Sequence, residues 1–437
     1  MNRYKQGSAY YGLIVLLSIS LILVGCSQAS SPTHRHTVSA AEAITWIRQN
    51  AIPLKTVEPG GSDADLLPLG PLIGNASMVG LGEETHGTHE FFAMKARIAE
   101  FLISHLGFTT FVMENDWGPS RLVDAYINGG SETIGDVMRQ SLLPLWQTQE
   151  YRDMLEWMRA YNTSPSHTTK IHFFGMDIQH TSQGDFDAVY TYVHMVDPQQ
   201  SPLVQQLYSQ SQVQQVYDLL LAHEQAYENR SSAQAFALAL QNARIIVQHT
   251  TYISQVPLPG SRLPPGYIQR DAFMAENVAW IHDHAAGSHP KLIVWAHNNH
   301  IANNPSYPPQ DAPKGTENMG GFLRKWYHDS YITIATSLYQ GVYNIYPGGS
   351  YPVPTALSGT PGNDTYNYTL GNVGIPLYLL DLRKTPPGPV TDWVNGPHIF
   401  LEYGGTGPDL SIPGSLQQWF DLLVFIRHTT ASRSLLS

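Results

Sequence analysis

Short apolar runs that end in polar residues recur along this chain, with segments of helical period between them. Nearly continuous apolar runs are typical of strands buried on both faces of a parallel sheet. The pattern predicts such strands at Met78–Gly82, Thr109–Glu114, Lys170–Asp177 and Lys291–Ala296. Because helical segments alternate with these strands, we expect an α/β fold whose mainly parallel sheet is flanked by helices.

The clearest helix is predicted from about Thr88 to His105, where apolar residues recur at helical spacing and Gly107 ends the pattern. Residues 183–255 are rich in Gln, Leu and Ala and poor in helix breakers, so they are predicted to be a helical insertion. The other predicted elements are helices from about 40, over 119–162 with a break at 129–130 and over 268–284, strands at 331–337 and 398–402, and a helix or helix-strand at 415–426. Together they predict one α/β domain over 40–437.

Two Pro- and Gly-rich loops are longer than ordinary connections, at 303–318 and 345–366. We expect them to form lids or the rim of a pocket.

The N-terminus predicts a lipoprotein signal peptide over residues 1–25. Arg3 and Lys5 precede an apolar segment, Tyr11–Val24, that is short for a membrane span and is followed by Gly25-Cys26. In this pattern Cys26 is lipidated and becomes the mature N-terminus, and residues 26–39 form a flexible tether. The alternative is an uncleaved anchor. Both interpretations predict an extracytoplasmic body whose contact with the membrane is through its N-terminus.

The composition narrows the range of partners. Charged residues make up 14% of the chain, well below the usual quarter, and the formal net charge is −11. A nucleic-acid partner would require a basic face, so none is expected. An acidic protein of this kind accepts neutral or cationic small molecules.

Ionisable side chains are concentrated directly after the first predicted strand, at Glu83, Glu84, His86, His89 and Glu90. Other strands end in Glu114, Asp177, and the pair His297 and His300. The carboxyl ends of parallel strands meet at one edge of a sheet, so we expect an active-site cleft there. Imidazole beside carboxylate suits the activation of water, because the base titrates near neutrality and the carboxylate fixes its tautomer.

Two alternatives compete with this interpretation. The spacing His-x-x-His occurs at His86/His89 and at His297/His300, which suggests a metal site. Neither pair lies in the His-Glu-x-x-His helix pattern that places two imidazoles on one face. Glu114 could instead form a structural salt bridge. We therefore expect no metal and no cofactor, and we expect His89 to be structural.

Nucleophilic catalysis by a side chain is disfavoured. The chain has no Gly-x-Ser-x-Gly motif, and its single cysteine, Cys26, belongs to the signal. Hydrolysis by an activated water is the simplest remaining chemistry.

Several of these motifs together resemble the erythromycin esterase family, over roughly residues 40–433. The segments that carry the resemblance are Gly82-Glu-Glu-Thr-His-Gly87, Phe111-Val-Met-Glu114, Phe174-Gly-Met-Asp177, Arg270-Asp-Ala-Phe-Met-Ala-Glu-Asn277, Val294-Trp-Ala-His297-Asn-Asn-His300 and Phe420-Asp-Leu-Leu-Val-Phe-Ile426. The resemblance implies an α/β fold with a deep cleft and hydrolysis of a macrolide lactone without a covalent intermediate.

The resemblance also implies roles for individual residues. The histidine that matches His86 is the general base in the family, and the residues that match Glu83, Glu114, His297 and His300 line the same cleft. Members that confer macrolide resistance carry arginine on the first helix, where this chain has Lys95. Lysine lacks the bidentate fork of arginine, so the resemblance implies membership of the family more strongly than cleavage of a macrolide.

The resulting hypothesis is a lipid-anchored, extracytoplasmic hydrolase of a carboxylic ester or lactone. His86 deprotonates a water and Glu83 or Glu114 orients it, while His297, His300 or Lys95 polarises the carbonyl. Asp177 and Arg270 support the substrate-binding side of the site. The alternatives are a metal-dependent hydrolase that uses the same Glu and His cluster, and a surface lipoprotein that binds a ligand without turnover.

Overall fold

The computed structural model describes residues 40–256, 266–284, 290–303, 317–349, 351–357, 359–403 and 410–436. The predicted signal peptide, Cys26 and the tether lie outside the described residues, as does most of the predicted lid at 303–318. Within the described part of the chain, no helix combines the length and the apolar character that a membrane crossing requires.

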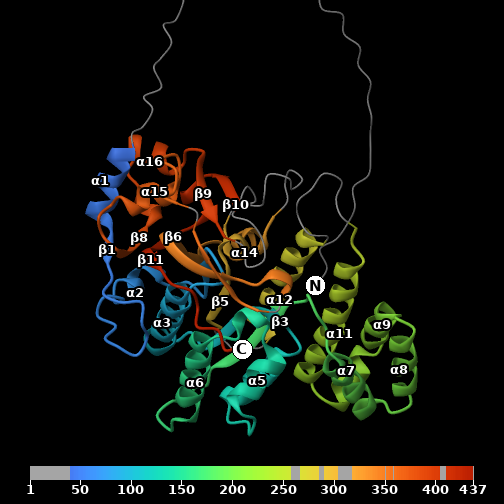
Figure 1. The fold of residues 1–437 in the computed structure, drawn as a ribbon. Helices are drawn as coiled ribbons and strands as arrows, with labels where there is room; N and C mark the ends of the chain where they lie inside the picture. Colours follow the sequence, from blue (N-terminus) through green and yellow to red (C-terminus); the bar gives the residue numbers. More distant parts are fainter. Residues whose placement is uncertain are drawn as a thin grey trace, which may run out of the picture. The chain divides into compact units, whose positions relative to one another are not determined.

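A nine-stranded sheet organises the described domain (Figure 1). Its strand order is β1-β8-β11-β6-β2-β5-β3-β4, and β7 pairs with β6 outside this path. The strands are β1 (Ile52–Pro53), β2 (Met78–Glu83), β3 (Thr110–Asp116), β4 (His172–Asp177), β5 (Leu292–His297), β6 (Tyr331–Ile345), β7 (Val353–Ala356), β8 (Leu377–Asp381) and β11 (Leu422–Thr429).

The six strands from β11 to β4 in this order are parallel to their neighbours. At the other edge, β8 runs antiparallel to β11 and β1 antiparallel to β8. All six residues of β2 are buried, as a central strand covered on both faces requires. The predicted fold class, a mainly parallel α/β sheet flanked by helices, is confirmed.

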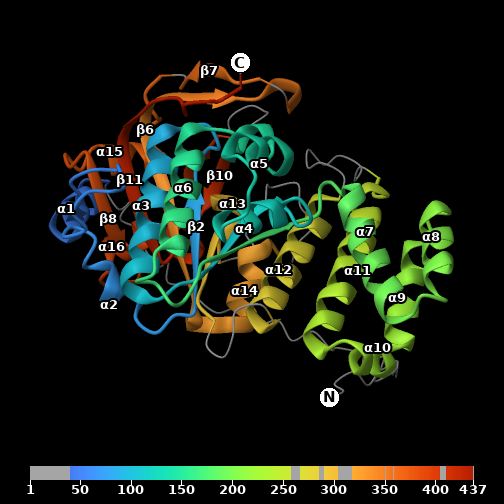
Figure 2. The ribbon, with the colours of Figure 1, turned by 90° about the horizontal axis from the view of Figure 1, so that it is seen from below.

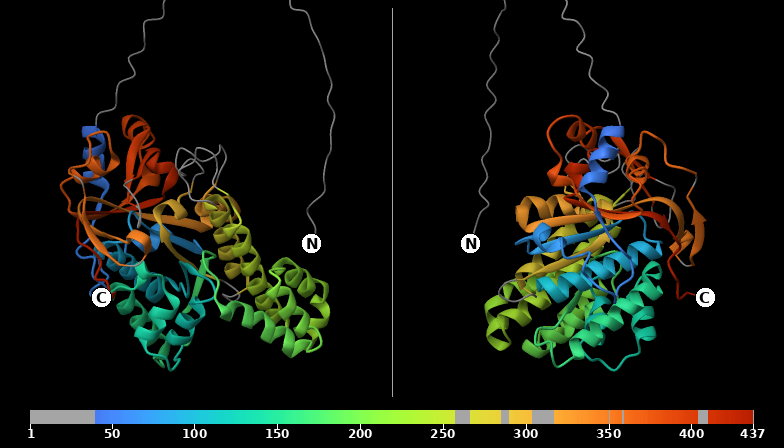
Figure 3. Two further views of the ribbon diagram at one scale, coloured as in Figure 1. Left: turned by 45° about the vertical axis from the view of Figure 1, so that its right-hand side comes forward. Right: turned by 90° about the vertical axis from the view of Figure 1, so that its left-hand side faces the viewer.

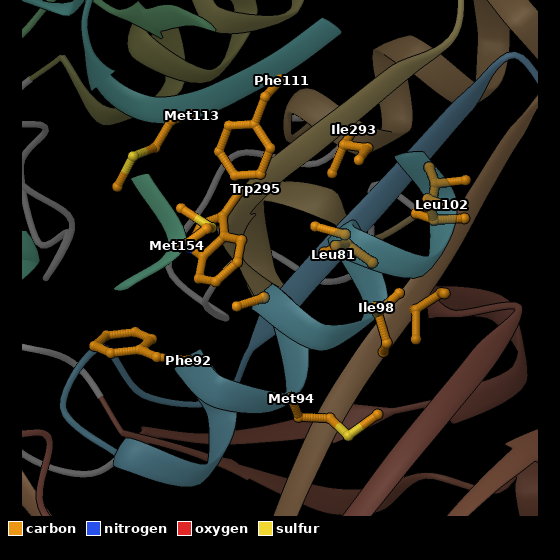
Figure 4. Packing of buried hydrophobic residues seen from close by; sticks show 14 of the residues in the cluster. Leu81, Phe92, Met94, Ile98, Leu102, Phe111, Met113, Met154, Ile293 and Trp295 are labelled. Carbon is orange, nitrogen blue, oxygen red and sulfur yellow. The ribbon is translucent and has the colours of Figure 1, made fainter. Parts of the chain in front are cut away.

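One face of the sheet carries the first large hydrophobic cluster. Leu81, Phe111, Ile293 and Trp295 pack there against one side of helix α3 (Figure 4). The helices on this face are α2 (Leu69–Ile73), α3 (His89–Leu106), α4 (Ser120–Ile127), α5 (Ile134–Ser141) and α6 (Gln149–Thr163). The segment predicted as helical over 119–162 is thus three helices, with breaks before α5 and before α6.

The opposite face carries the second cluster, to which Met78, Val112 and Val294 contribute from the strands. Its helices are α1 (Ala40–Asn50), α12 (Tyr267–His284), α13 (Asn298–Ile301), α14 (Met319–Tyr327), α15 (Tyr366–Gly371), α16 (Pro389–Val394) and α17 (Leu416–Trp419). A Cβ on Gly82 would lie 2.3 Å from the Asn298 side chain, so the glycine lets α13 approach the end of β2.

The segment predicted as a helical insertion folds as helices around a hydrophobic cluster of its own. It packs along α12 beside the β4 edge of the sheet through α11 (Figures 2 and 3). The helices are α7 (Gln183–Val196), α8 (Ser201–Ser209), α9 (Val213–Ala222), α10 (Glu224–Arg230) and α11 (Ala233–Ile253).

Antiparallel pairing adds elements near the C-terminus that the local pattern predicted poorly. The strand expected at 331–337 extends to Ile345, and part of the predicted loop 345–366 pairs back on it as β7. A second sheet joins β9 (His398–Glu402) and β10 (Leu410–Gly414). The helix or helix-strand expected at 415–426 is α17 followed by β11.

Candidate active site

The carboxyl ends of the central strands bring the predicted residues to one edge of the sheet. Glu83 at the end of β2 is in register with His297 at the end of β5. Glu114 belongs to β3 on the other side of β5, and Asp177 ends β4. The predicted convergence of these strand ends is therefore present.

The turn after β2 forms a carboxylate–imidazole dyad. His86 Nδ1 lies 2.9 Å from Glu83 Oε1, and the carboxylate is fully buried while the imidazole is 14% exposed. A Cβ on Gly87 would lie 2.0 Å from the backbone oxygen of Asn344, so only glycine allows β6 to cross the turn here. The crossing fixes the backbone that carries His86.

Burial lowers the pKa of His86 to about 4, with the positive charges of His300 and Arg270 acting in the same direction against Glu114. The ring is therefore neutral at pH 7. With Nδ1 donating to Glu83, Nε2 is the basic atom, and the hydrogen bond of the ring among the described residues is the one through Nδ1. The dyad has the form of a base prepared to accept a proton from water.

Lys95 on α3 occupies the other oxygen of Glu83. Its Nζ contacts Glu83 Oε2 and lies 4.0 Å from the centre of the Trp295 ring. Burial holds the pKa of Lys95 well below its ordinary value. The contact leaves Oε1 of Glu83 for His86, so Lys95 fixes the carboxylate of the dyad.

Glu114 lies at the centre of a buried row of alternating charges. Its Oε1 is 2.8 Å from Arg270 Nη2 and 3.2 Å from His300 Nε2, and its Oε2 accepts from the backbone N–H of His297 at 3.0 Å. Burial opposes ionisation of Glu114, but the charges of His300 and Arg270 prevail and hold its pKa well below its usual range. Glu114 is therefore an anion that anchors two cations.

His300 and Arg270 keep their positive charges through further carboxylates. His300 Nδ1 lies 2.6 Å from Asp271 Oδ1. Although burial acts in the opposite direction, Asp271 and Glu114 raise the pKa of His300 to about 10. Arg270 Nε donates to Asp177 at 2.9 Å, so Asp177 holds the guanidinium and is itself fully buried.

His297, the last residue of β5, differs from His300, which lies three residues later on α13. Its Nδ1 accepts from the backbone N–H of Asn299 at 3.3 Å, and its Nε2 lies 3.2 Å from Glu402 Oε2. Burial holds the pKa of His297 well below its ordinary value, and the positive charge of His300 adds to the effect. Its ring centre is 4.9 Å from that of His86, and Trp146 packs on His86 at the same distance.

The remaining ionisable residues of the first turn lie in scaffolding contacts. Glu84 accepts from the Leu338 backbone at 2.6 Å, and burial raises its pKa well above the ordinary value. His89 bridges Glu150 and Glu58, whose carboxylates raise its pKa to about 9. Glu90 accepts from Thr430.

Sequence reasoning missed two carboxylates of the site, Asp271 and Glu402. Asp271 follows Arg270 directly in a segment that already carried the family resemblance, which is a usable signal. Glu402 ends a predicted strand that had not been assigned to the site, and no local pattern indicated its partner.

Three side chains converge in a way that could hold a metal. One ligand atom from each of Glu83, His86 and Glu114 lies within 4.8 Å of the other two. However, both oxygens of Glu83 already have partners, and Glu114 is neutralised by Arg270 and protonated His300. A divalent cation would meet these positive charges at close range, so the residues present fit a metal poorly.

Known proteins with similar sequences are named as esterases or hydrolases. A family model described as Erythromycin esterase matches residues 103–429. The chain is 23% identical to erythromycin esterase type II of Escherichia coli over 329 residues, which cover 68% of this chain and 77% of that protein. It is also 23% identical to the putative hydrolase YbfO of Bacillus subtilis strain 168 over 455 residues, covering 96% and 98% of the two chains.

Solved structures share the fold. A Bacillus cereus protein superposes with a TM-score of 0.80 at 30% identity, covering 90% of this chain and 99% of that one. A succinoglycan biosynthesis protein superposes with a TM-score of 0.74 at 30% identity, covering 90% of this chain and 98% of that one. A mutant of the erythromycin esterase EreC in its open conformation superposes with a TM-score of 0.65 at 17% identity, covering 87% of this chain and 98% of that one.

Proposed function

We propose, from the premise that this chain belongs to the erythromycin esterase family, that it hydrolyses a carboxylic ester or lactone with a water activated by His86. Its family and its relatives named as esterase and hydrolase support hydrolase activity. The observation that carries the finer proposal is the Glu83–His86 dyad, in which a neutral imidazole has Nδ1 bound and Nε2 available.

In the proposed reaction, Nε2 of His86 takes a proton from water as the oxygen attacks the ester carbonyl. Glu83 accepts from Nδ1–H and stabilises the imidazolium that forms. The same Nε2–H then protonates the alkoxide as the tetrahedral intermediate collapses to acid and alcohol. No side chain is acylated at any step.

Stabilisation of the oxyanion requires positive charge that is fixed before the reaction begins. His300 and Arg270 supply it, since Asp271, Glu114 and Asp177 keep both charged and oriented. His297 carries no such charge, because burial lowers its pKa, so its contribution is to the packing around His86. Lys95 acts through Glu83.

The direct test is mass spectrometry of products after incubation of the pure protein with macrolides, simpler lactones and linear esters. Addition of one water to a substrate by the unaltered protein, and its loss in H86N, is the expected result. Saturable binding without any product across the panel would favour the alternative of a ligand-binding lipoprotein.

A metal-dependent hydrolase is a second candidate because Glu83, His86 and Glu114 converge. The two mechanisms predict different responses to metal stripping. If water and His86 suffice, turnover should survive treatment with a chelator. Elemental analysis of the active protein should then find no stoichiometric metal. Loss of activity on stripping and its return with one added ion per chain would establish the metal mechanism.

We propose that the substrate is a small neutral or cationic ester or lactone. A macrolide lactone is the narrowest substrate that we propose. Placement outside the cytoplasmic membrane, through lipidation of Cys26, is a separate proposal from the sequence of residues 1–26. Fractionation of cells expressing the full chain should find it with the membrane, and C26S should release it or block its processing.

A further inference from the structure

The end of β9 lies beside the turn that carries the proposed base. Thr85 and Tyr403 form a parallel bridge, and the Tyr403 N–H donates to the backbone oxygen of Glu84 at 2.9 Å. This pairing brings Glu402 to the site from a segment far along the chain. The Glu402 side chain is fully buried.

The carboxylate of Glu402 contacts two consecutive residues after β5. Its Oε1 accepts from Asn298 Nδ2 at 3.1 Å, and its Oε2 lies 3.2 Å from His297 Nε2. Asn298 also donates to the Thr336 backbone at 2.9 Å, which ties this contact to β6. Glu402 is therefore held in place independently of His297.

The contacts of His297 define one tautomer. Because Nδ1 accepts from the Asn299 N–H, the proton of the neutral ring is on Nε2, the nitrogen that faces Glu402. The N–H is not aligned with the oxygen well enough to be a hydrogen bond. Active-site contacts of this kind are often misaligned until substrate binds.

The orientation of His297 matters because its ring is one of two that hold His86. The planes of His297 and His86 meet at 62°, and Trp146 meets His86 at 85° from its own position. A rotation of His297 would remove one of these supports and change where Nε2 of His86 points.

We propose that Glu402 is a positioning residue of this site, which acts through His297 to hold the ring of His86 in its productive orientation. The inference rests on the proposed function and deepens it. The site then contains two carboxylate–imidazole pairs, Glu83–His86 and Glu402–His297, whose rings contact each other. The first pair moves the proton and the second fixes the geometry of the first.

The test compares E402Q with E84Q. Both glutamates are fully buried and lie on neighbouring segments, but Glu84 contacts Leu338 and Asn367 and no histidine of the site. For E402Q we expect kcat to fall about 10- to 100-fold, as it does when the carboxylate that orients a metal-bound histidine is removed. KM should change little, because the substrate's own contacts remain. E84Q should keep its kcat.

A double-mutant cycle with H297Q separates positioning from general loss of stability. If Glu402 acts through His297, E402Q adds no further loss of kcat in the H297Q background. Multiplicative losses, or equal kcat values for E402Q and E84Q, would overturn the inference.

The imidazole nitrogens give a readout that does not need activity. In ¹⁵N-histidine spectra, the signals missing in H297Q identify His297. The unaltered protein should show its neutral Nε2–H form, with that proton shifted in E402Q and unshifted in E84Q. If the unaltered protein hydrolyses nothing in the panel, the proposed function fails, and these spectra alone decide whether Glu402 holds His297. An unshifted Nε2 proton in E402Q would contradict the proposed contact between Glu402 and His297.

Discussion

The turn that leads from β2 into α3 and the turn that leads from β5 into α13 carry the same spacing, His-x-x-His. In each turn the first histidine is neutral, since burial lowers the pKa of His86 to about 4 and that of His297 well below its ordinary value. In each turn the second histidine is cationic, since carboxylates raise the pKa of His89 to about 9 and that of His300 to about 10.

The difference between the turns lies in the second histidine. His300 points back toward Glu114 and remains part of the site, whereas His89 points toward Glu58 and Glu150, away from the cluster around Glu114. The His-x-x-His spacing therefore does not determine which role each histidine has. The number of carboxylates around each ring and its distance from solvent decide whether an imidazole serves as a base, a fixed cation or a structural contact.

The largest expected effect separates the two histidines of the first turn. H86N removes the proposed base, so kcat/KM should fall by about 10²- to 10⁴-fold, the range for general base catalysis. H89Q is the matched control and should keep kcat/KM. Equal activity of H86N and the unaltered protein in a product assay would contradict the mechanism.

The second effect concerns His300, which is buried between two carboxylates. H300Q leaves Glu114 and Asp271 without their shared cation, so the free energy of unfolding should fall by about 3–5 kcal/mol. Denaturant unfolding measures it. H297Q, which removes a neutral ring, is the comparison and should cost clearly less; a larger loss in H297Q would show that the charges are assigned wrongly.

The third prediction uses pH to distinguish His300 from His86. The pKa of His300 is raised in the folded state, so its contribution to stability is complete below pH about 6.5 and is lost as the pH rises through about 10. The gap in unfolding free energy between the unaltered protein and H300Q should shrink over that window.

For His86 the dependence of folding stability on pH has the opposite sign. Its pKa is lowered, so the unfolded chain binds a proton between pH about 6.5 and 4 that the folded chain does not. H86N should therefore lose less stability than the unaltered protein as the pH falls through this window. A parallel decline in the two proteins would argue against a neutral His86.

The smallest effect is expected at His89. H89Q breaks charged contacts to Glu150 and Glu58, which should lower the free energy of unfolding by about 2 kcal/mol. Thermal unfolding at pH 7 measures the change, and activity at a temperature well below the transition should be unaffected. A loss of activity in folded H89Q would place this residue in the site.

The sequence by itself determined the parallel strands, the helix after the first of them and the polar residues at the strand ends. These features are local, because the apolar period, the helix-ending Gly107 and the position of Glu83 or His297 after a strand can all be read within one segment. The central convergence followed from the rule that parallel strands end at one edge. The antiparallel strand β8 was missed, although Leu377–Asp381 is itself a short apolar run that ends in a carboxylate.

Only the tertiary structure decided which imidazoles are charged and which carboxylates serve them. Asp271 and Glu402 reach His300 and His297 from α12 and β9, and neither pairing leaves a mark on the local pattern. The pKa of a buried group depends on desolvation and on every charge within a few ångströms. Those distances are set by how the elements pack, so four histidines with one spacing become two neutral rings and two cations only in the folded protein.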